Sequence, residues 1–543
     1  MSSVLPTPVL PTPGRNINRG HFPDDFIFGA GTSSYQIEGA AREGGRGPSI
    51  WDTFTHTHPE LIQDGSNGDT AINSYNLYKE DIKIVKLMGL DAYRFSISWP
   101  RILPGGSINA GINQEGIKYY NNLIDELLAN DIVPYVTLFH WDVPQALQDQ
   151  YDGFLSDKIV DDFRDFAELC FWEFGDRVKN WITINEPQSY SDFFGVAYDT
   201  PPKAHALKAS RLLVPTTVAR PSKPVRVFAS TADPGTTTAD QVYKVGHNLL
   251  LAHAAAIQVY RDKFQNTQEG TFGMALVTQW MKPLNENNPA DVEAASRAFD
   301  FKFGWFMQPL ITGEYPKSMR QLLGPRLREF TPDQKKLLIG SYDYVGVNYY
   351  TATYVSSAQP PHDKKKAVFH TDGNFYTTDS KDGVLIGPLA GPAWLNIVPE
   401  GIYHVLHDIK ENYEDPVIYI TENGVYEVND TAKTLSEARV DTTRLHYLQD
   451  HLSKVLEARH QGVRVQGYLV WSLMDNWELR AGYTSRFGLI HVDYYNNFAR
   501  YPKDSAIWFR NAFHKRLRIH VNKARPQEDD GAFDTPRKRL RKY

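Results

Sequence analysis

The sequence has little cysteine, no dominant charge and no long apolar run. Its one cysteine, Cys170, excludes an intrachain disulfide and a zinc cage built from several cysteines. The 58 Lys and Arg nearly balance the 64 Asp and Glu, so the net charge of −6 creates no basic field for nucleic acid or a membrane surface. No segment approaches the ~18 apolar residues of a membrane span. We therefore expect a large buried core, with neither nucleic acid nor a membrane as partner.

Three segments differ from the rest of the chain in composition. Residues 1–20 are rich in Pro and Thr and are predicted to form a flexible arm. Residues 200–232 carry five prolines, six Lys or Arg and no acid, which predicts a long, variable, exposed loop. Residues 514–543 are charged in blocks and predict a disordered basic tail. The remainder, 21–513, is expected to form one globular domain.

Eight short β-rich runs alternate with longer helical patterns in that domain. One such pattern, 117–128, places Ile117, Tyr120, Leu123, Ile124, Leu127 and Leu128 on one predicted face. Runs with apolar side chains on both faces, each followed by a helix, favour a parallel (β/α)8 barrel. Its long loops after the strands would form the mouth of the site. Periodicity alone leaves a doubly wound open sheet as the alternative. The runs are 26–31, 92–98, 133–140, 181–185, 272–278, 345–350, 417–421 and 468–472.

Polar side chains follow many of these runs, where a barrel carries its chemistry. Glu186 and Glu422 end the fourth and seventh runs, and burying an unpaired carboxylate there would cost several kcal/mol. Across a barrel mouth they can come within the ~5–5.5 Å of a double-displacement glycosidase. The alternative, two unrelated rim residues each held by an arginine or an amide, is disfavoured by the other polar groups at the strand ends.

Six longer motifs surround these strand ends. They are Ser34-Tyr35-Gln36-Ile37-Glu38-Gly39-Ala40, Tyr93-Arg94-Phe95-Ser96-Ile97-Ser98-Trp99, Leu138-Phe139-His140-Trp141-Asp142, Thr183-Ile184-Asn185-Glu186-Pro187, Asn348-Tyr349-Tyr350-Thr351 and Thr421-Glu422-Asn423-Gly424. By these motifs the sequence resembles the family 1 β-glycosidases of the plant β-glucosidase type over about 21–513. Within the family, it resembles the glucosidases of monoterpenoid alkaloids.

The resemblance implies a role for each polar residue. Glu186 would be the acid/base and Glu422 the nucleophile, which Arg94 and Tyr350 would hold, with Asn348 in support. The expected reaction is hydrolysis of a bulky alkaloid glucoside, such as the tetrahydroisoquinoline-monoterpenoid glucosides of the ipecac type, without cofactor or metal. Sugar hydroxyls would contact Gln36, His140, Asn185 and Glu478, above the apolar platform of Trp471.

The sequence departs from the family pattern mainly around the expected aglycone mouth. Leu479 stands where the family has an aromatic residue after Glu478, unless Trp477 fills its place. Gln188 replaces the usual aromatic or histidine, and with Phe193 and Phe194 we expect it to face the aglycone. Trp394 matches the family's aglycone-wall tryptophan. The alternative for Trp394 is a half-buried ring that only packs the barrel rim.

Four other functions are alternatives to this interpretation. A redox enzyme is suggested by Gly29-Ala30-Gly31 after a strand, but the third glycine of the dinucleotide fingerprint is absent. A metal hydrolase is suggested by His404 and His407, but no set of carboxylates accompanies them as further metal ligands. A catalytically weak nuclear binding protein is argued against by the intact glutamate pair. A transglucosidase would use the same residues as a hydrolase, and the oligomeric state is open between monomer and homo-oligomer.

The two ends of the sequence suggest a location. The N-terminus lacks the basic start and apolar run of a secretory signal, so we expect an intracellular protein. Residues 536–543 hold five basic residues within six positions, which is typical of a nuclear import signal and would bind an import receptor. A solubilising tail is the alternative. The expected location is the nucleus, the cytoplasm or both.

Overall fold

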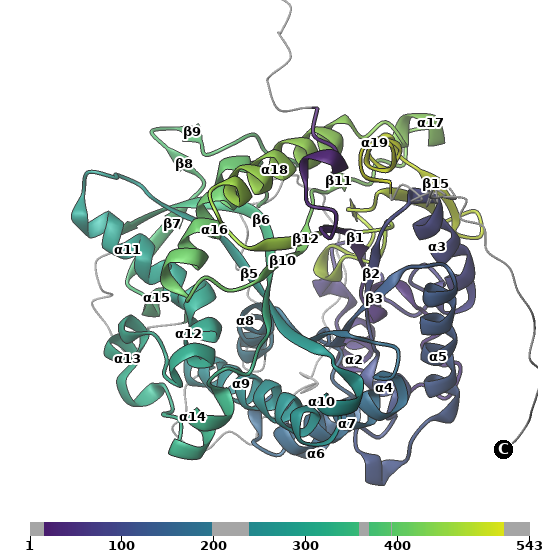
Figure 1. The fold of residues 1–543 in the computed structure, drawn as a ribbon, viewed down its shortest axis with the longest axis horizontal. Helices are drawn as coiled ribbons and strands as arrows, with labels where there is room; N and C mark the ends of the chain where they lie inside the picture. Colours follow the sequence, from purple (N-terminus) through teal and green to yellow (C-terminus); the bar gives the residue numbers. More distant parts are fainter. Residues whose placement is uncertain (1–15, 198–237, 358–368, 392–393, 515–543) are drawn as a thin grey trace, which may run out of the picture.

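The centre of the structure is a closed barrel of eight parallel strands. The computed structural model describes residues 16–197, 238–357, 369–391 and 394–514. The strands are neighbours in the order β10-β12-β1-β2-β3-β4-β5-β6, and β10 also pairs with β6, which closes the sheet (Figure 1). The predicted barrel is thus confirmed over the open sheet. Its strands are β1 (Ile27–Gly31), β2 (Ala92–Ser96), β3 (Val133–Phe139), β4 (Asn180–Asn185), β5 (Thr271–Pro283), β6 (Tyr344–Ser357), β10 (Ile418–Asn423) and β12 (Val465–Trp471).

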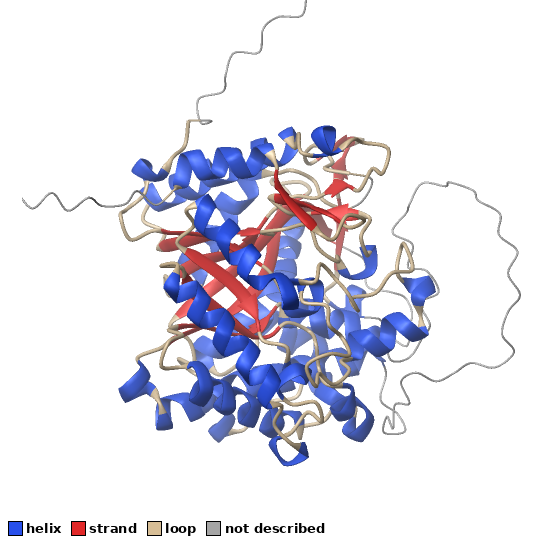
Figure 2. Cartoon of the chain, turned by 90° about the vertical axis from the view of Figure 1, so that its right-hand side faces the viewer, coloured by secondary structure: helices blue, strands red, loops and turns tan. Residues whose placement is uncertain are grey.

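Helices surround the barrel, and shorter elements occupy the connections (Figure 2). The longer helices are α3 (Ser74–Met88), α5 (Gln114–Ala129), α7 (Ile159–Phe174), α9 (Thr238–Lys263), α11 (Pro289–Phe299), α16 (Pro399–Asn412), α18 (Thr442–His460) and α19 (Asp504–Phe513). The remaining helices, most of them shorter, are α1 (Ser34–Ile37), α2 (Ile50–Thr57), α4 (Trp99–Ile102), α6 (Gln145–Tyr151), α8 (Pro187–Ala197), α10 (Gln265–Gln268), α12 (Trp305–Thr312), α13 (Lys317–Leu323), α14 (Pro332–Leu338), α15 (Phe369–Asp372) and α17 (Leu435–Ala438).

Two strands run beyond the barrel. β5 and β6 are longer than the predicted runs, and β6 pairs with the antiparallel strand β7 (Phe375–Thr378) outside the ring. Short strand pairs β8 (Ser380–Lys381) with β9 (Val384–Leu385), β11 (Glu427–Val428) with β13 (Ser485–Arg486), and β14 (Ile490–Asp493) with β15 (Ala499–Pro502) lie in the connections. One π-helical turn, η5 (Asp300–Gly304), joins α11 to α12.

The helix α5 shows how the apolar pattern places a helix on the barrel. Asn113 caps its first turn by accepting from the backbone N–H of Glu115. The predicted face is buried from Ile117 to Leu127, but Leu128 is 40% exposed. The prediction for Leu128 was wrong because the helix ends at Ala129, where the next turn no longer covers the barrel.

Aromatic rings fill the amino-terminal half of the barrel interior. Tyr419 of β10 lies 5.6 Å from the Tyr135 ring and 5.0 Å from the Tyr344 ring, centroid to centroid. The Tyr344 hydroxyl donates to the carbonyl of Trp181 at 2.8 Å, so its buried polar end is satisfied. This packed layer separates the carboxyl ends of the strands from the opposite end of the barrel.

The packed part of the chain begins earlier than predicted. Ile17 is buried, and Arg19 pairs with Asp91 at 2.6 Å and donates to the carbonyl of Phe513 at 2.8 Å. Residues 17–20 therefore belong to the domain, because long-range contacts that no local pattern reveals hold them there. The remaining arm (1–15), the 200–232 loop and the tail from 515 lie outside the described residues. None of the described helices is long and apolar enough to cross a membrane.

Candidate active site

The carboxyl ends of the barrel strands bring most of the predicted site residues together. Arg94 comes from β2, Asn185 from the end of β4, and Glu422 from β10. The polar members are buried, apart from Glu478, which is half-buried. The remaining members are Gln36 on α1, His140 after β3, Glu186 after β4, Asn348 and Tyr350 on β6, Trp471 at the end of β12, and Glu478 beyond it.

Glu422 is held by two donors, one on each carboxylate oxygen. Arg94 donates through Nη1 to Oε1 at 2.6 Å, and the Tyr350 hydroxyl donates to Oε2 at 2.6 Å. Burial and the nearby Glu422 charge raise the pKa of Tyr350 well above its usual value, so the phenol remains a donor. A guanidinium and a phenol that converge on one buried group suit a carboxylate whose orientation is fixed.

Arg94 also orders the neighbouring strands. This fully buried guanidinium donates to Asn185 Oδ1 at 2.7 Å and to Thr137 Oγ1 at 3.1 Å. Asn348 donates through Nδ2 to Asn185 Oδ1 at 3.1 Å and to Glu186 Oε1 at 2.9 Å. Its own Oδ1 accepts from Thr421 Oγ1 at 2.6 Å. A continuous network therefore links the two glutamates.

Glu186 occupies a sharp turn between β4 and α8. Its φ of +44° lies in the left-handed region, which costs a non-glycine residue of the order of 1–3 kcal/mol and is concentrated at functional sites. Burial first, and then the charge of Glu422, raises the pKa of Glu186 to about 7. The carboxyl can therefore both donate and accept a proton near neutrality.

His140 is fixed as a neutral ring. Because Asn185 Oδ1 accepts from Arg94, its Nδ2 must donate to His140 Nε2, 3.2 Å away, which leaves the ring proton on Nδ1. Burial and the charge of Arg94 lower the pKa of His140 well below its usual value. The ring lies nearly parallel to Trp471, with the centroids 5.8 Å apart. Among the described residues, His140 Nδ1 is a buried donor with no protein partner.

Glu478 and Gln36 form a second polar pair. Gln36 Oε1 accepts from Ser33 Oγ at 2.6 Å, so its Nε2 is free to donate to Glu478 Oε2 at 3.3 Å and to Asn476 Oδ1 at 3.0 Å. Burial raises the pKa of Glu478 to about 8, with a smaller contribution from Glu422. Within the described part of the chain, Glu478 Oε1 has no hydrogen-bond partner. Such buried polar atoms need a ligand or water to satisfy them.

The residues expected near the aglycone fall into different environments. Trp394 is 48% exposed and meets Tyr350 edge-on at 6.1 Å, so much of its ring is not used in packing. Gln188 is buried, and its Oε1 has no partner among the described residues. Phe193 is half-buried and stacks on Trp51 at 5.3 Å. The Phe194 side chain lies outside the described residues.

Trp477 does not replace the aromatic residue that Leu479 lacks. Its ring is fully buried and edge-on to Tyr35 at 5.2 Å and to Trp51 at 5.6 Å. Its Nε1 donates to Ser66 Oγ at 3.0 Å. The ring is therefore part of an aromatic core cluster beside the site, and the departure at Leu479 stands.

Sequence reasoning missed several residues of the network. Thr137 and Thr421 point inward from β3 and β10, but a strand threonine carries no distinguishing signal. Trp141 donates to the Asn185 carbonyl at 2.8 Å. Lys302 acts electrostatically on Glu186 from the π-helical turn η5. A charge inside a helical pattern gives no sign of such a position.

The structure bears on two of the alternative functions. A Cβ on Gly29 would lie 2.4 Å from Leu469 Cδ2 and 2.6 Å from the Ala92 carbonyl, so this glycine lets barrel strands approach rather than cradling a phosphate. His404 stacks on Trp280 at 4.3 Å. No group of three or more potential metal ligands occurs among the described residues.

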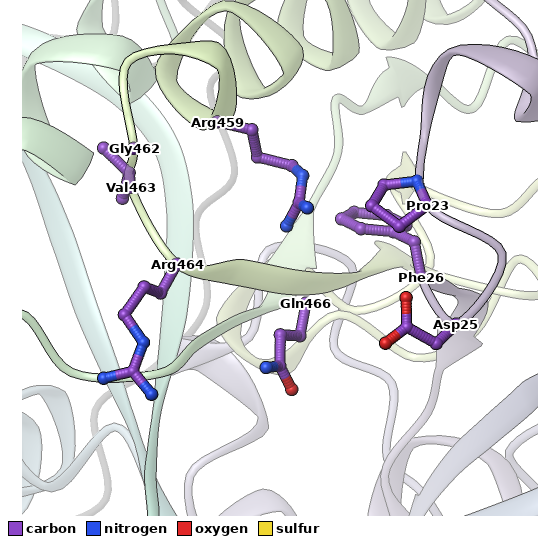
Figure 3. A pocket seen from close by; sticks show the side chains of 8 residues that line it. All are labelled: Pro23, Asp25, Phe26, Arg459, Gly462, Val463, Arg464 and Gln466. Atoms are coloured by element: carbon purple, nitrogen blue, oxygen red, sulfur yellow. The ribbon is translucent and has the colours of Figure 1, made fainter.

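A separate cavity of about 240 Å³ lies at the opposite end of the barrel (Figure 3). It opens near the start of β1 and β12 and contains one carboxylate, so it lacks the pair found at the carboxyl ends. Its lining residues are Pro23, Asp25, Phe26, Arg459, Gly462, Val463, Arg464 and Gln466.

Known proteins resemble the chain over almost its full length. The sequence pattern of glycosyl hydrolase family 1 matches residues 18–517. Ipecoside beta-D-glucosidase of Carapichea ipecacuanha is 99% identical over 543 residues, covering 100% of both chains. Raucaffricine-O-beta-D-glucosidase of Rauvolfia serpentina is 54% identical and covers 97% of each chain. A rice beta-glucosidase structure superposes with a TM-score of 0.83 at 42% identity, covering 92% of this chain and 99% of its own.

Proposed function

The chain belongs to glycosyl hydrolase family 1, and we propose that it is a retaining β-glucosidase of bulky alkaloid glucosides. The bond it hydrolyses is the O-β-D-glucosidic bond of a tetrahydroisoquinoline-monoterpenoid glucoside. One observation carries this proposal: two buried glutamates of one network have opposite surroundings, one clamped by donors and the other with its pKa raised to about 7.

In the first step, Glu422 attacks the anomeric carbon and Glu186 protonates the leaving oxygen. The bond between that carbon and the aglycone oxygen breaks as the glucosyl–Glu422 ester forms. Arg94 and Tyr350 orient the attacking carboxylate. The proton of Glu186 goes to the aglycone, which departs as an alcohol.

In the second step, the ionised Glu186 takes a proton from water, and the water oxygen attacks the anomeric carbon. The ester bond to Glu422 breaks, and β-glucose leaves with its configuration retained. Loss of the Glu422 charge in the ester removes one cause of the raised pKa of Glu186, so more of this group is ionised and available as the base in the glucosyl-enzyme. A related mutant rice enzyme is described as a covalent complex with Glc, which supports an ester intermediate.

The sugar is assigned to the polar cluster around His140 and Glu478. Gln36, His140, Asn185 and Glu478 would bond its hydroxyls, and Trp471 would lie beneath the ring. Support comes from His140 Nδ1 and Glu478 Oε1, buried polar atoms without a protein partner in the described part of the chain.

The aglycone is assigned to the rim that carries Trp394. The half-exposed Trp394 ring offers a flat surface, and Gln188, Phe193 and Phe194 would complete the wall. Ipecoside and raucaffricine are the compounds for which the two relatives are named, and they are the first substrates to compare.

The proposed function is tested with a panel of alkaloidal and simple glucosides, followed by proton NMR of the first-formed sugar. We expect glucose release, the highest kcat/KM for an alkaloid glucoside, and β-glucose before mutarotation. Early α-glucose would exclude the retaining mechanism. No glucose from any glucoside would favour the nuclear binding protein, and an alkyl glucoside formed in place of glucose with added alcohol would favour the transglucosidase.

We also propose that the protein is nuclear. The support is the sequence of 536–543, where five basic residues in six positions suit an import receptor. A fluorescent fusion of the full chain should accumulate in nuclei, and a fusion lacking 536–543 should spread through the cell while hydrolysing glucosides as before. A cytosolic full-length fusion would leave 536–543 as a solubilising tail.

A further inference from the structure

Helix α18 directs polar side chains toward the strands that carry the nucleophile and its phenol donor. Arg444, Tyr447 and His451 are spaced by three and four residues, so they share one side of the helix, and all three are buried. A helix that covers a barrel usually buries an apolar stripe, and a buried polar group needs a hydrogen-bond partner. Arg444 pairs with Asp441, at the start of its own helix, at 2.6 Å. The partners of the Tyr447 hydroxyl lie instead on β6 and β10.

The Tyr447 hydroxyl joins the backbone of β6 to the end of β10. It donates to the Tyr350 carbonyl at 2.9 Å and accepts from Asn423 Nδ2 at 3.0 Å. These directions are fixed, because Asn423 Oδ1 accepts from the Tyr468 hydroxyl and the amide nitrogen must therefore donate. Tyr350 in turn donates its own hydroxyl to Glu422 at 2.6 Å. One hydroxyl on an outer helix thus contacts both the phenol donor of Glu422 and the residue that follows Glu422 in the sequence.

Tyr350 lies where the regular pairing of β6 is interrupted. The pairing of β6 with β10 ends at Tyr349, which is opposite Asn423. The pairing of β6 with β5 is regular up to Tyr349 and shifts before Ala352. A buried carbonyl in such a place needs a donor from outside the ladder. The bond from Tyr447 therefore holds the Tyr350 backbone at a point where the sheet is irregular.

His451 holds the Tyr447 ring in its place. Its ring stacks on the Tyr447 ring, with the centroids 3.7 Å apart, and its Nδ1 donates to the Tyr447 carbonyl at 2.7 Å. Burial raises the pKa of Tyr447 well above its usual value, so the hydroxyl keeps the proton that it donates. Replacing Tyr447 with phenylalanine would keep the ring and this stack, and would remove only the bonds of the hydroxyl.

Resting on the proposed function, we propose that Tyr447 is a positioning residue for the attack by Glu422. Its hydroxyl fixes the Tyr350 backbone, so that the Tyr350 phenol stays aimed at the Glu422 carboxylate. The attacking oxygen must be held in a near-attack geometry, because small displacements slow the reaction strongly. Tyr447 is only 1% exposed, so it acts through Tyr350 rather than by touching the substrate.

The test is a double-mutant cycle of Tyr447→Phe and Tyr350→Phe. The kcat/KM for a dinitrophenyl glucoside reports the attack by Glu422, because this leaving group needs no proton. Tyr447→Phe should lower it ~10-fold, the effect of one lost buried hydrogen bond, and should leave the inhibition constant of glucose within ~2-fold of the wild type. In the Tyr350→Phe background the same substitution should change kcat/KM by less than ~2-fold, because the phenol through which Tyr447 acts is absent.

Tyr344→Phe is the matched control. Tyr344 is also a buried barrel tyrosine whose hydroxyl donates to a backbone carbonyl, that of Trp181 at 2.8 Å, but it lies in the amino-terminal half of the barrel. Its loss should lower the free energy of unfolding and leave kcat/KM unchanged. An unchanged kcat/KM in Tyr447→Phe, an equal fall in Tyr344→Phe, or a full effect of Tyr447→Phe in the Tyr350→Phe background would overturn the proposal. Absence of hydrolysis by the wild type would instead overturn the proposed function.

Discussion

The ends of β4 and β10 carry the same residue type in opposite surroundings. At β10, Glu422 receives Arg94 on one oxygen and the Tyr350 hydroxyl on the other. At β4, Glu186 receives the neutral Asn348 amide and lies within the influence of Glu422, and its pKa is raised to about 7. Neighbours, rather than the carboxyl itself, therefore suit one glutamate to the proposed role of nucleophile and the other to that of acid.

One of the two strands between them, β6, makes the difference possible. β6 pairs with β10, and Asn348 lies in register with Glu422 while donating its amide to Glu186. The closed barrel thus places two carboxyls on one network but gives the cation to only one of them. Substitutions at each end should therefore differ in kind.

The largest effect is expected for Glu422→Gln. Without the nucleophile no ester forms, so turnover of every glucoside should fall by about 10⁴-fold or more. Steady-state kinetics on activated and unactivated glucosides measures this, with the exposed Glu411→Gln on α16 as the matched control. Residual activity that depended on the leaving group would assign Glu422 a different role.

Glu186→Gln should have a smaller effect that depends on the substrate. A leaving group that requires a proton should lose ~10²–10⁴-fold in kcat/KM, whereas a dinitrophenyl group should lose little in the first step. Comparing the two substrates measures the contribution of the proton. Equal losses on both would remove the distinction between the ends of β4 and β10.

Replacing Trp394 should affect substrate choice rather than bond cleavage. In Trp394→Ala an alkaloid glucoside loses a flat contact worth ~0.5–1.5 kcal/mol, so its kcat/KM should fall ~2- to 10-fold more than that of a phenyl glucoside. The 74% exposed Trp172 on α7 provides the control substitution to alanine. Parallel losses on both substrates would return Trp394 to packing of the barrel rim.

The last expected effect is on stability rather than on rate, and it depends on pH. The folded state raises the pKa of Glu186, so it binds more protons than the unfolded chain, and the free energy of unfolding falls as pH rises toward about 7. Glu186→Gln removes that loss, which is at most about 3 kcal/mol. Denaturant unfolding should show a larger gain at pH 8 than at pH 5. Equal gains would mean that ionisation of Glu186 is not the cause.

The fold and the polar groups at the strand ends could be predicted because both are local patterns. Runs with apolar side chains on both faces indicated the strands. Charged residues directly after them, such as Glu186 and Glu422, could not be part of the apolar core. Features set by distant contacts could not be predicted. Ile17 and Arg19 join the domain through partners far along the chain, Leu128 is exposed where a helix ends, and Lys302 depends on a π-helical turn.

A ¹³C NMR titration of glutamate carboxyls in wild type, Glu186→Gln and Glu422→Gln tests whether the charge of Glu422 raises the pKa of Glu186. We expect one carboxyl that titrates near pH 7, distinct from Glu478 near 8, and that disappears in Glu186→Gln. In Glu422→Gln the same signal should move to lower pH, because the charge that raises it is gone. A signal that persists in Glu186→Gln, or that stays at the same pH in Glu422→Gln, would show that Glu422 does not set the protonation of Glu186.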